Sequence, residues 1–280
     1  AAIQGGGAYV RPWDKETGPG ATYRSLTVLD PYSPESEITP HARTMYLEIS
    51  DGNQASVIKE ISHPGFEAVT RETFHLDQGP ATAVEVETTG EVRTAVAGHA
   101  LPIGFGASSM YWQFGAHDTD RVDVWDEQGA VIAQYALSNP PQGQATVELI
   151  GEVAPGQTFG LLQSDRDESH YSHKPELPYS QRTNLLYTVK RAYLQLPDGT
   201  RIDFQPRIKV YIFHTDSEVV DNVVVWAEVP EELRGYLTGG TQFRFEYVVT
   251  ATRANRPARG QSILVSEPER LSAELMARRW

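Results

Sequence analysis

The sequence predicts an all-β protein: a jelly-roll-type β-sandwich or barrel with long loop decorations, extended terminal arms and a short C-terminal helix. Three observations predict this fold class. Runs that alternate apolar and polar residues recur about every ten residues, a spacing typical of sandwiches and barrels. Turn sequences rich in glycine, proline and aspartate separate these runs. A convincing helical pattern occurs only near the end of the chain.

The clearest local signal is a β-hairpin over residues 183–214. Two β-rich runs are joined there by LPDGT at 196–200. Proline presets φ at the first turn position, aspartate bonds nearby backbone, and glycine accepts a positive φ. We therefore expect a tight turn centred on Asp198 and Gly199.

The apolar residues of this hairpin change parity in its first strand. Leu185, Tyr187 and Val189 alternate in one phase, whereas Ala192 and Leu194 alternate in the other. All of these can face one core only if the strand skips a residue, so a β-bulge is expected at 190–191.

The second strand contains Pro206, which cannot donate a ladder hydrogen bond. It should mark an edge position or a break between two strands.

Residues 1–20 are predicted to form a flexible N-terminal arm because GGG at 5–7 and TGPG at 17–20 resist regular structure. A frayed terminus is the simpler interpretation. An arm that orders against a neighbouring subunit is the alternative, with Tyr9, Val10 and Trp13 as its apolar anchors.

Residues 21–252 form the predicted sandwich body, which could include a small inserted β subdomain in the middle of the chain. Val84 and Val86 alternate with Glu85 and Glu87, which indicates a half-buried strand. The run 219–229 is nearly all apolar and predicts a central strand that is covered on both faces. The expected strands outside the hairpin are 22–29, 43–49, 55–61, 66–74, 81–87, 91–97, 108–114, 121–125, 130–137, 145–150, 157–163, 219–229 and 241–252.

Residues 253–280 form a basic C-terminal segment with a predicted helix at 267–279. Ser266 and a following glutamate form a capping box. Arg253, Arg256 and Arg259 give the segment a positive charge on an acidic chain. This charge either solubilises an ordinary loop or contacts an acidic patch or a membrane surface.

Composition excludes several classes of function. The formal net charge is −13, which opposes nucleic-acid binding by the body as a whole. The chain has no cysteine, so neither disulfides nor thiol chemistry contribute. The sequence shows no signal-peptide pattern and no apolar run long enough to span a bilayer, so we expect a soluble chain.

The strongest metal-ligand candidates are Asp165, Asp167, His170 and His173 in a polar segment. They lack the HExxH or cysteine spacing that fixes zinc geometry, so an exposed polar loop without metal is expected. Four aspartates around one strand lack the glycine and glutamate of an EF-hand loop, and strand alternation predicts that they are a solvated face. These are Asp118, Asp120, Asp123 and Asp126.

No catalytic motif is present. The sequence contains no GxSxG elbow, phosphate-binding loop or dinucleotide fingerprint, and nothing singles out a pair of catalytic carboxylates. The aromatic run SSMYWQF at 108–114 could stack on sugars, although core packing explains it better. We therefore expect neither enzymatic activity nor a cofactor.

The glycine-rich opening AAIQGGGAYVRPWDKETGPGA, the LPDGT hairpin and the arginine-rich, cysteine-free β character support a resemblance. The chain resembles the larger major capsid protein of Thermus-infecting icosahedral internal-membrane phages, in the single jelly-roll lineage. The resemblance implies a structural virion protein that self-assembles through repeated interfaces, with itself and a smaller capsid protein as partners and an internal lipid membrane nearby. The alternative is a carbohydrate-active β-sandwich, either a polysaccharide lyase or a carbohydrate-binding module.

Overall fold

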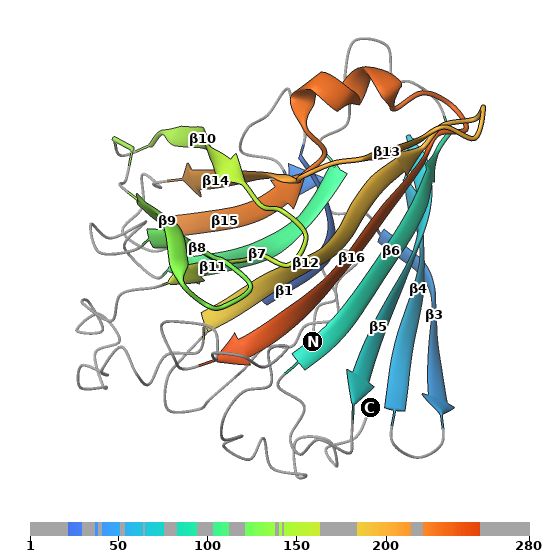
Figure 1. Ribbon diagram of the computed structural model, residues 1–280, viewed down its shortest axis with the longest axis horizontal. Helices are drawn as coiled ribbons and strands as arrows, with labels where there is room; N and C mark the ends of the chain where they lie inside the picture. Colours follow the sequence, from blue (N-terminus) through green and yellow to red (C-terminus); the bar gives the residue numbers. More distant parts are fainter. Residues whose placement is uncertain are drawn as a thin grey trace.

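The computed structural model describes residues 22–29, 37–38, 41–50, 54–63, 65–75, 83–93, 103–111, 121–137, 140–141, 143–162, 184–213 and 221–252. Within them the chain forms sixteen β-strands and one short 3-10 helix, η3 (Glu231–Tyr236). The all-β prediction is confirmed (Figure 1).

The strands form two antiparallel sheets. The large sheet has the order β3-β4-β5-β6-β16-β12-β11-β8-β9, with β13 paired to β12. Its strands are β3 (His41–Ser50), β4 (Gln54–His63), β5 (Phe66–His75), β6 (Ala83–Val92), β8 (Arg121–Trp125), β9 (Val131–Ala136), β11 (Thr158–Leu162), β12 (Asn184–Gln195), β13 (Arg201–Asp203) and β16 (Gln242–Thr252). The small sheet has the order β10-β14-β15-β7-β1-β2. Its strands are β1 (Thr22–Leu29), β2 (Glu37–Ile38), β7 (Ile103–Tyr111), β10 (Ala145–Glu152), β14 (Arg207–Phe213) and β15 (Asp221–Glu228).

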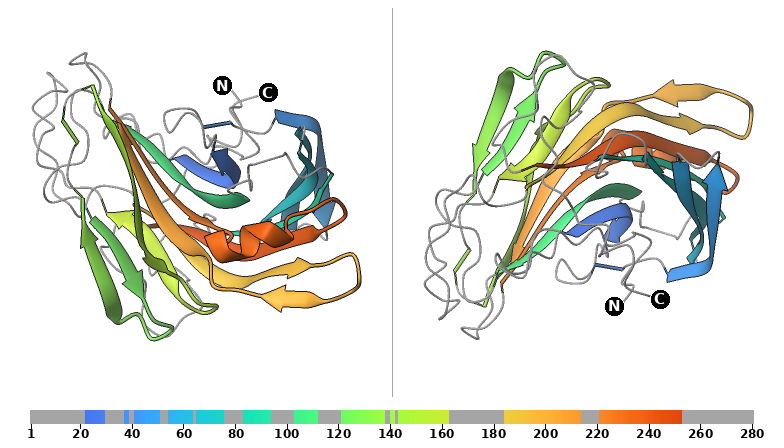
Figure 2. Two further views of the ribbon diagram at one scale, coloured as in Figure 1. Left: turned by 90° about the horizontal axis from the view of Figure 1, so that it is seen from above. Right: turned by 90° about the horizontal axis from the view of Figure 1, so that it is seen from below.

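The two sheets pack as a β-sandwich, and the large sheet curves strongly (Figure 2). These sheets are larger than those of an eight-stranded jelly roll. We call the face of the large sheet toward the small sheet its inner face and the opposite face its outer face.

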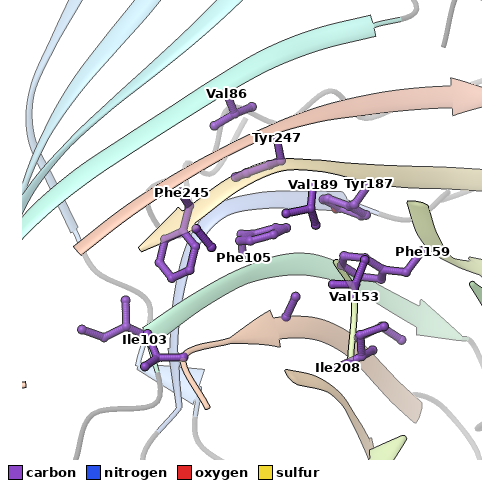
Figure 3. Close-up of a cluster of buried hydrophobic side chains, with 14 of the residues drawn as sticks. Val86, Ile103, Phe105, Val153, Phe159, Tyr187, Val189, Ile208, Phe245 and Tyr247 are labelled. Atoms are coloured by element: carbon purple, nitrogen blue, oxygen red, sulfur yellow. The ribbon is translucent and has the colours of Figure 1, made fainter. Parts of the chain in front are cut away.

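The core between the sheets is aromatic at its centre. Phe105 of β7 stacks on Tyr247 of β16 with ring centroids 4.0 Å apart, and it also contacts Phe245 (Figure 3). Tyr187 of β12 donates a hydrogen bond of 2.6 Å from its hydroxyl to the carbonyl of Gly106, which joins the two sheets. Burial raises the pKa of Tyr247 well above its ordinary value. The centre of the sandwich is therefore closely packed and shielded from bulk solvent.

The hairpin predicted over 183–214 is present as β12 and β13. Gly199 has a φ of 89°, and the amide of Leu196 donates to the carbonyl of Thr200 at 2.8 Å. The pairing of β12 with β16 shifts register between Val189 and Arg191. Both the turn and the bulge are confirmed.

Pro206 lies where the chain leaves one sheet for the other. β13 belongs to the large sheet, and β14 begins directly after Pro206 in the small sheet. The predicted break is confirmed, because a residue without an amide donor fits a crossing better than a ladder.

Two other strand predictions are also confirmed. β15 lies between β14 and β7, and its residues from Val225 onward are buried on both faces. β16 places Phe243, Phe245 and Tyr247 in the core. Thr250, on the opposite face of β16, is also fully buried.

Two predicted strands were placed wrongly. The expected strand at 91–97 does not begin at residue 91, because β6 runs without interruption from Ala83 to Val92. The expected strand at 108–114 is β7, which begins at Ile103. The sequence pattern did not predict the first residues of β7, because Gly104 and Gly106 lie there and glycine is a poor strand former. A Cβ at Gly106 would lie 2.1 Å from the carbonyl oxygen of Val225, so the close approach of β15 requires glycine there.

η3 is fixed to the small sheet by buried charge. The carboxylate of Glu228 accepts a hydrogen bond of 2.6 Å from the indole of Trp226 and pairs with Lys209 at 2.9 Å and with Arg234 of η3. Glu228 is 1% exposed, so its charge is stabilised by these partners and not by water. No helix among the described residues is long and apolar enough to span a membrane.

Candidate functional site: a carboxylate groove on the outer face

The outer face of the large sheet carries a groove with a volume of about 380 Å³ over β4, β5, β6 and the start of β16. We call it the carboxylate groove. Three glutamates on three strands contribute to its lining, together with a threonine, a glutamine and one exposed valine. The side chains that point outward into it are Glu60, Glu67, Val69, Thr89, Glu91 and Gln242.

Strand register brings these residues together. Glu67 of β5 pairs with Glu91 of β6, which in turn pairs with Gln242 of β16. The next row contains Glu60, Val69 and Thr89 on β4, β5 and β6. Alternation sends their neighbours inward, where Ala68 and Val92 are buried in the core. The groove is thus built on paired strands, which hold side chains in place better than loops do.

The charges in the groove are only partly compensated. Glu67 and Glu91 are directly opposite on adjacent antiparallel strands, where like charges repel. Arg93 forms an ion pair with Glu67, and both side chains remain about half exposed. Such a pair contributes less than about 1 kcal/mol to stability. The glutamate oxygens therefore remain accessible as hydrogen-bond acceptors.

The floor of the groove is rigid because the core packs tightly beneath it. A Cβ added at Gly90 would lie 2.0 Å from the ring of Phe243, whose ring meets that of Phe66 edge-on at 5.8 Å. The glycine lets β6 approach this aromatic pair closely. Movement of the floor would disturb the packed core.

A row of ion pairs continues from the groove along the outer face. Arg244 pairs with Glu87 at 2.7 Å and with Glu246 at 2.8 Å, and Lys190 pairs with Glu85 at 2.7 Å. The positive and negative charges of this row neutralise one another. The carboxylate excess in the groove contrasts with this balanced surface.

The groove suits a neutral, hydroxyl-rich ligand. Carboxylates accept hydrogen bonds, while Thr89 and Gln242 can both donate and accept. Val69 is 46% exposed and offers a small apolar surface between the polar side chains. No group of three or more potential metal ligands is found in the part of the chain that the structure describes.

A second polar cluster lies inside the sandwich and is closed to ligands. Lys59 of β4 forms an ion pair with Glu72 of β5, and their side chains are 1% and 0% exposed. Burial lowers the pKa of Lys59, and the neighbouring carboxylate opposes this shift. The pair shapes the core but is not accessible.

The sequence-based site candidates have different outcomes. Asp165, Asp167, His170 and His173 lie outside the described residues, so the structure does not test their interpretation as a polar loop. The same is true of the arm at 1–20, the segment 253–280 with its helix at 267–279, and the interface candidates Tyr9, Val10, Trp13, Arg253, Arg256 and Arg259. Asp118 and Asp120 also fall outside the described residues, as do Trp112 and Phe114.

The solvated-face interpretation is wrong for Asp123. Its side chain is fully buried, pairs with Arg121 at 2.9 Å and accepts a hydrogen bond of 3.1 Å from Gln134. Trp125 on the same face is also buried and packs with Leu162 and Leu186 in a small second core. β8 has two buried faces, whereas the alternation rule assumes one.

Asp126 stabilises the tip of the β8–β9 hairpin. Its carboxylate accepts hydrogen bonds from the backbone amides of Gln128 and Ala130 at 3.0 and 2.7 Å. Gly129 follows with a φ of 77°. Hydrogen bonds from an aspartate carboxylate to nearby backbone amides are typical of tight turns.

Sequence reasoning missed the groove glutamates. Glu91 was assigned to a separate strand, so its position opposite Glu67 was not foreseen. The alternation of polar residues could be read from the sequence of each strand, but the pairing of the two strands could not.

A β-sandwich with a polar groove across one sheet is a class of fold that carries many functions. Residues 1–269 match the family "Periplasmic glucan biosynthesis protein, MdoG". The chain belongs to the MdoG family. A search of curated proteins found no relative of this chain.

Two solved structures share a distant likeness. One is a GH36 alpha-galactosidase from Geobacillus stearothermophilus in complex with stachyose, with 10% identity and a TM-score of 0.34 over 83% of this chain. The chain spans 28% of the length of that protein. The other is described as an aldose 1-epimerase from Escherichia coli, with 11% identity and a TM-score of 0.33 over 80% of this chain and 78% of that one. Similarity at this level carries no argument about fold or function.

The family match corrects the phage interpretation. The resemblance to capsid proteins of Thermus phages is wrong, and so are the virion localisation, the capsid assembly function and the partnership with a smaller capsid protein and an internal membrane. The resemblance rested on composition, a glycine-rich opening and the LPDGT hairpin, none of which is specific to one fold or function. The carbohydrate alternative agrees better with the family.

Proposed function

We propose that this chain binds glucan in the periplasm during glucan biosynthesis, and that the carboxylate groove holds the glucan. The single observation that carries the proposal is the match of residues 1–269 to a family of periplasmic glucan biosynthesis proteins. The groove supports it with exposed acceptors and donors on a rigid floor.

The charge of the protein favours a neutral polymer. A chain with a net charge of −13 and a groove rich in glutamate repels polyanions. Neutral glucan hydroxyls can donate hydrogen bonds to Glu60, Glu67 and Glu91. Because these contacts are made on an open sheet face, they fit a chain that lies across the strands.

We propose that the groove binds glucan without cleaving it. Glu67 is paired with Arg93, and an ion-paired carboxylate accepts hydrogen bonds from hydroxyl groups.

Cleavage is the second candidate, and one observation favours it. Glu67 and Glu91 are directly opposite each other on adjacent strands, so two carboxyl groups project side by side from the same face of the sheet. Glycosidases use two carboxyl groups held near each other.

Calorimetric titration with neutral gluco-oligosaccharides of different linkage tests binding. The double variant Glu60→Gln/Glu91→Gln should weaken the affinity by about tenfold or more, since each substitution replaces a charged acceptor with a neutral one. Glu48→Gln on β3 is the matched control, because Glu48 is exposed on the same face but lies outside the groove.

Unchanged affinity in the double variant would show that glucan does not bind in the carboxylate groove. Absence of binding to every glucan would overturn the function itself. Release of reducing ends by the wild type, abolished in Glu91→Gln, would replace binding by cleavage as the function.

A further inference from the structure

The outer face of the large sheet carries a row of solvent-accessible side chains that starts in the carboxylate groove and continues beyond it. Its members are paired one after another on β5, β6, β16, β12 and β13, which follow one another across the sheet (Figure 1). We call them the polar row: Glu67, Glu91, Gln242, Gln195 and Arg201. Neighbouring strands are about 4.8 Å apart, so the row is about 19 Å long. Gln195 and Arg201 lie outside the groove.

The charge of the polar row changes along its length. Two glutamates stand at the groove end, two glutamines in the middle and one arginine at the far end. A polyanion would be repelled at the first end, and a polycation would be repelled at the other. A neutral polymer, whose hydroxyl groups both donate and accept hydrogen bonds, meets a suitable partner at every position.

Arg201 is held in place by its neighbours in the β12–β13 hairpin. Its guanidinium carbon lies 4.1 Å from the centre of the Tyr193 ring, and its Nε donates a hydrogen bond of 3.1 Å to the carboxylate of Asp203. Its Nη2 donates to the same carboxylate. These two bonds leave further N–H donors of the guanidinium for a ligand. Because the ring and the carboxylate restrict this long side chain, less entropy is lost when it binds.

The amide of Gln195 is oriented as well. Its Nε2 donates to the carbonyl of Gly199 in the hairpin turn. The side-chain oxygen of Gln195 therefore remains as an acceptor beside the donors of Arg201.

The charged side chains next to the polar row are less suitable, because they bind one another. Arg244 pairs with Glu87 at 2.7 Å and with Glu246 at 2.8 Å. In contrast, the side chains of Glu91 and Gln242 are exposed and have no hydrogen-bond or ion-pair partner among the residues that the structure describes. The polar row is therefore the line along which a ligand displaces the fewest existing contacts.

We propose that one glucan chain lies along the polar row, perpendicular to the strands, with Gln195 and Arg201 as a second subsite outside the carboxylate groove. This inference rests on the glucan binding proposed above and adds the direction of the bound polymer, from β5 to β13. A short oligosaccharide fills the groove alone, whereas a longer one also reaches Arg201. Longer glucans bind more tightly, because Arg201 adds charge-assisted hydrogen bonds to their hydroxyl groups.

Calorimetric titration of the full chain with neutral gluco-oligosaccharides of increasing length tests the second subsite. The affinity of the wild type should rise by about tenfold or more between ligands that fill the groove and ligands that span the row. Arg201→Gln should abolish this rise and leave the affinity for the shortest ligands unchanged, which also shows that the variant is folded. Arg191→Gln is the matched control, because Arg191 is an exposed arginine of β12 that pairs with Glu246 outside the row.

The outcomes separate this inference from the proposed function. Affinity that does not depend on length, or an equal loss in Arg201→Gln and Arg191→Gln, would rule out the second subsite while the groove still binds glucan. A loss in Arg201→Gln that is the same for short and long ligands would also rule it out, since the substitution would then act through the fold. Absence of binding to every oligosaccharide would overturn the proposed function and the second subsite with it.

Discussion

The centre and the β3 end of the large sheet are built from the same alternating pattern, yet only the centre is covered. At the centre Phe105 of the small sheet stacks on Tyr247, and the neighbouring side chains are fully buried. At the β3 end Leu47 and Ile49 occupy equivalent inward positions and remain more than half exposed. Alternation determines which face a residue takes, whereas burial depends on what lies opposite.

The largest effect is expected at the centre. Phe105→Ala removes the ring that contacts Tyr247 and Phe245 and leaves a cavity between the sheets. The free energy of unfolding should fall by about 3–5 kcal/mol. Urea denaturation followed by tryptophan fluorescence measures this loss, and a change below about 0.5 kcal/mol, as expected for a surface substitution, would contradict the closely packed centre.

The boundary between the two regions holds the Lys59–Glu72 pair. Glu72→Ala leaves a buried ammonium without its carboxylate and should cost about 3–5 kcal/mol. The double variant Lys59→Met/Glu72→Leu should restore most of this stability, since it removes both charges. If the double variant were as unstable as the single one, shape and not charge would explain the loss.

The same pair makes stability depend on pH. Burial lowers the pKa of Lys59 below its ordinary value of 10.5. Between the lowered value and 10.5 the unfolded chain binds more protons than the folded chain, so the contribution of Lys59 to the free energy of unfolding rises with pH. Denaturation at several alkaline pH values should show this rise in the wild type and not in the double variant.

A smaller effect is expected beneath the carboxylate groove. Gly90→Ala inserts a methyl group 2.0 Å from the ring of Phe243, so the core must shift. Overpacking should cost about 1–3 kcal/mol. Gly199→Ala is a useful comparison, because its Cβ meets no atom within 4 Å and its cost comes only from the positive φ of 89°.

The smallest effect is expected at the β3 end. Leu47→Ala should change the stability of the monomer by no more than about 0.5 kcal/mol, because the side chain is 65% exposed. A loss similar to that of Phe105→Ala would show that the β3 end of the sheet is covered in solution.

The sequence allowed the fold class to be predicted, together with the details that depend on neighbours along the chain. The LPDGT turn, the bulge at 190–191 and the break at Pro206 were all foreseen, because each follows from the backbone preferences or parity of one short stretch. The buried Asp123 was not foreseen. Its environment depends on contacts across the sheet, which alternation in a single strand does not reveal.

The candidate site was not predictable in the same way. Glu67, Glu91 and Gln242 become neighbours only through the pairing of β5, β6 and β16, and the last of these strands is distant in sequence. A site dispersed over a sheet surface leaves no contiguous motif. The absence of motifs therefore favoured a structural role too strongly, and the capsid interpretation followed from that.

The position of β16 has a consequence for how the chain folds during synthesis. β16 is the last described strand, yet it lies between β6 and β12 in the middle of the large sheet. Until it is made, β3–β6 form one meander, and β12, β11, β8 and β9 form a second set of paired strands, each with an open edge toward the other. The two halves can join only after residues 242–252 have been synthesised. A chain that ends before them lacks the central strand of its large sheet. It then exposes two unpaired strand edges, which favour proteolysis and aggregation.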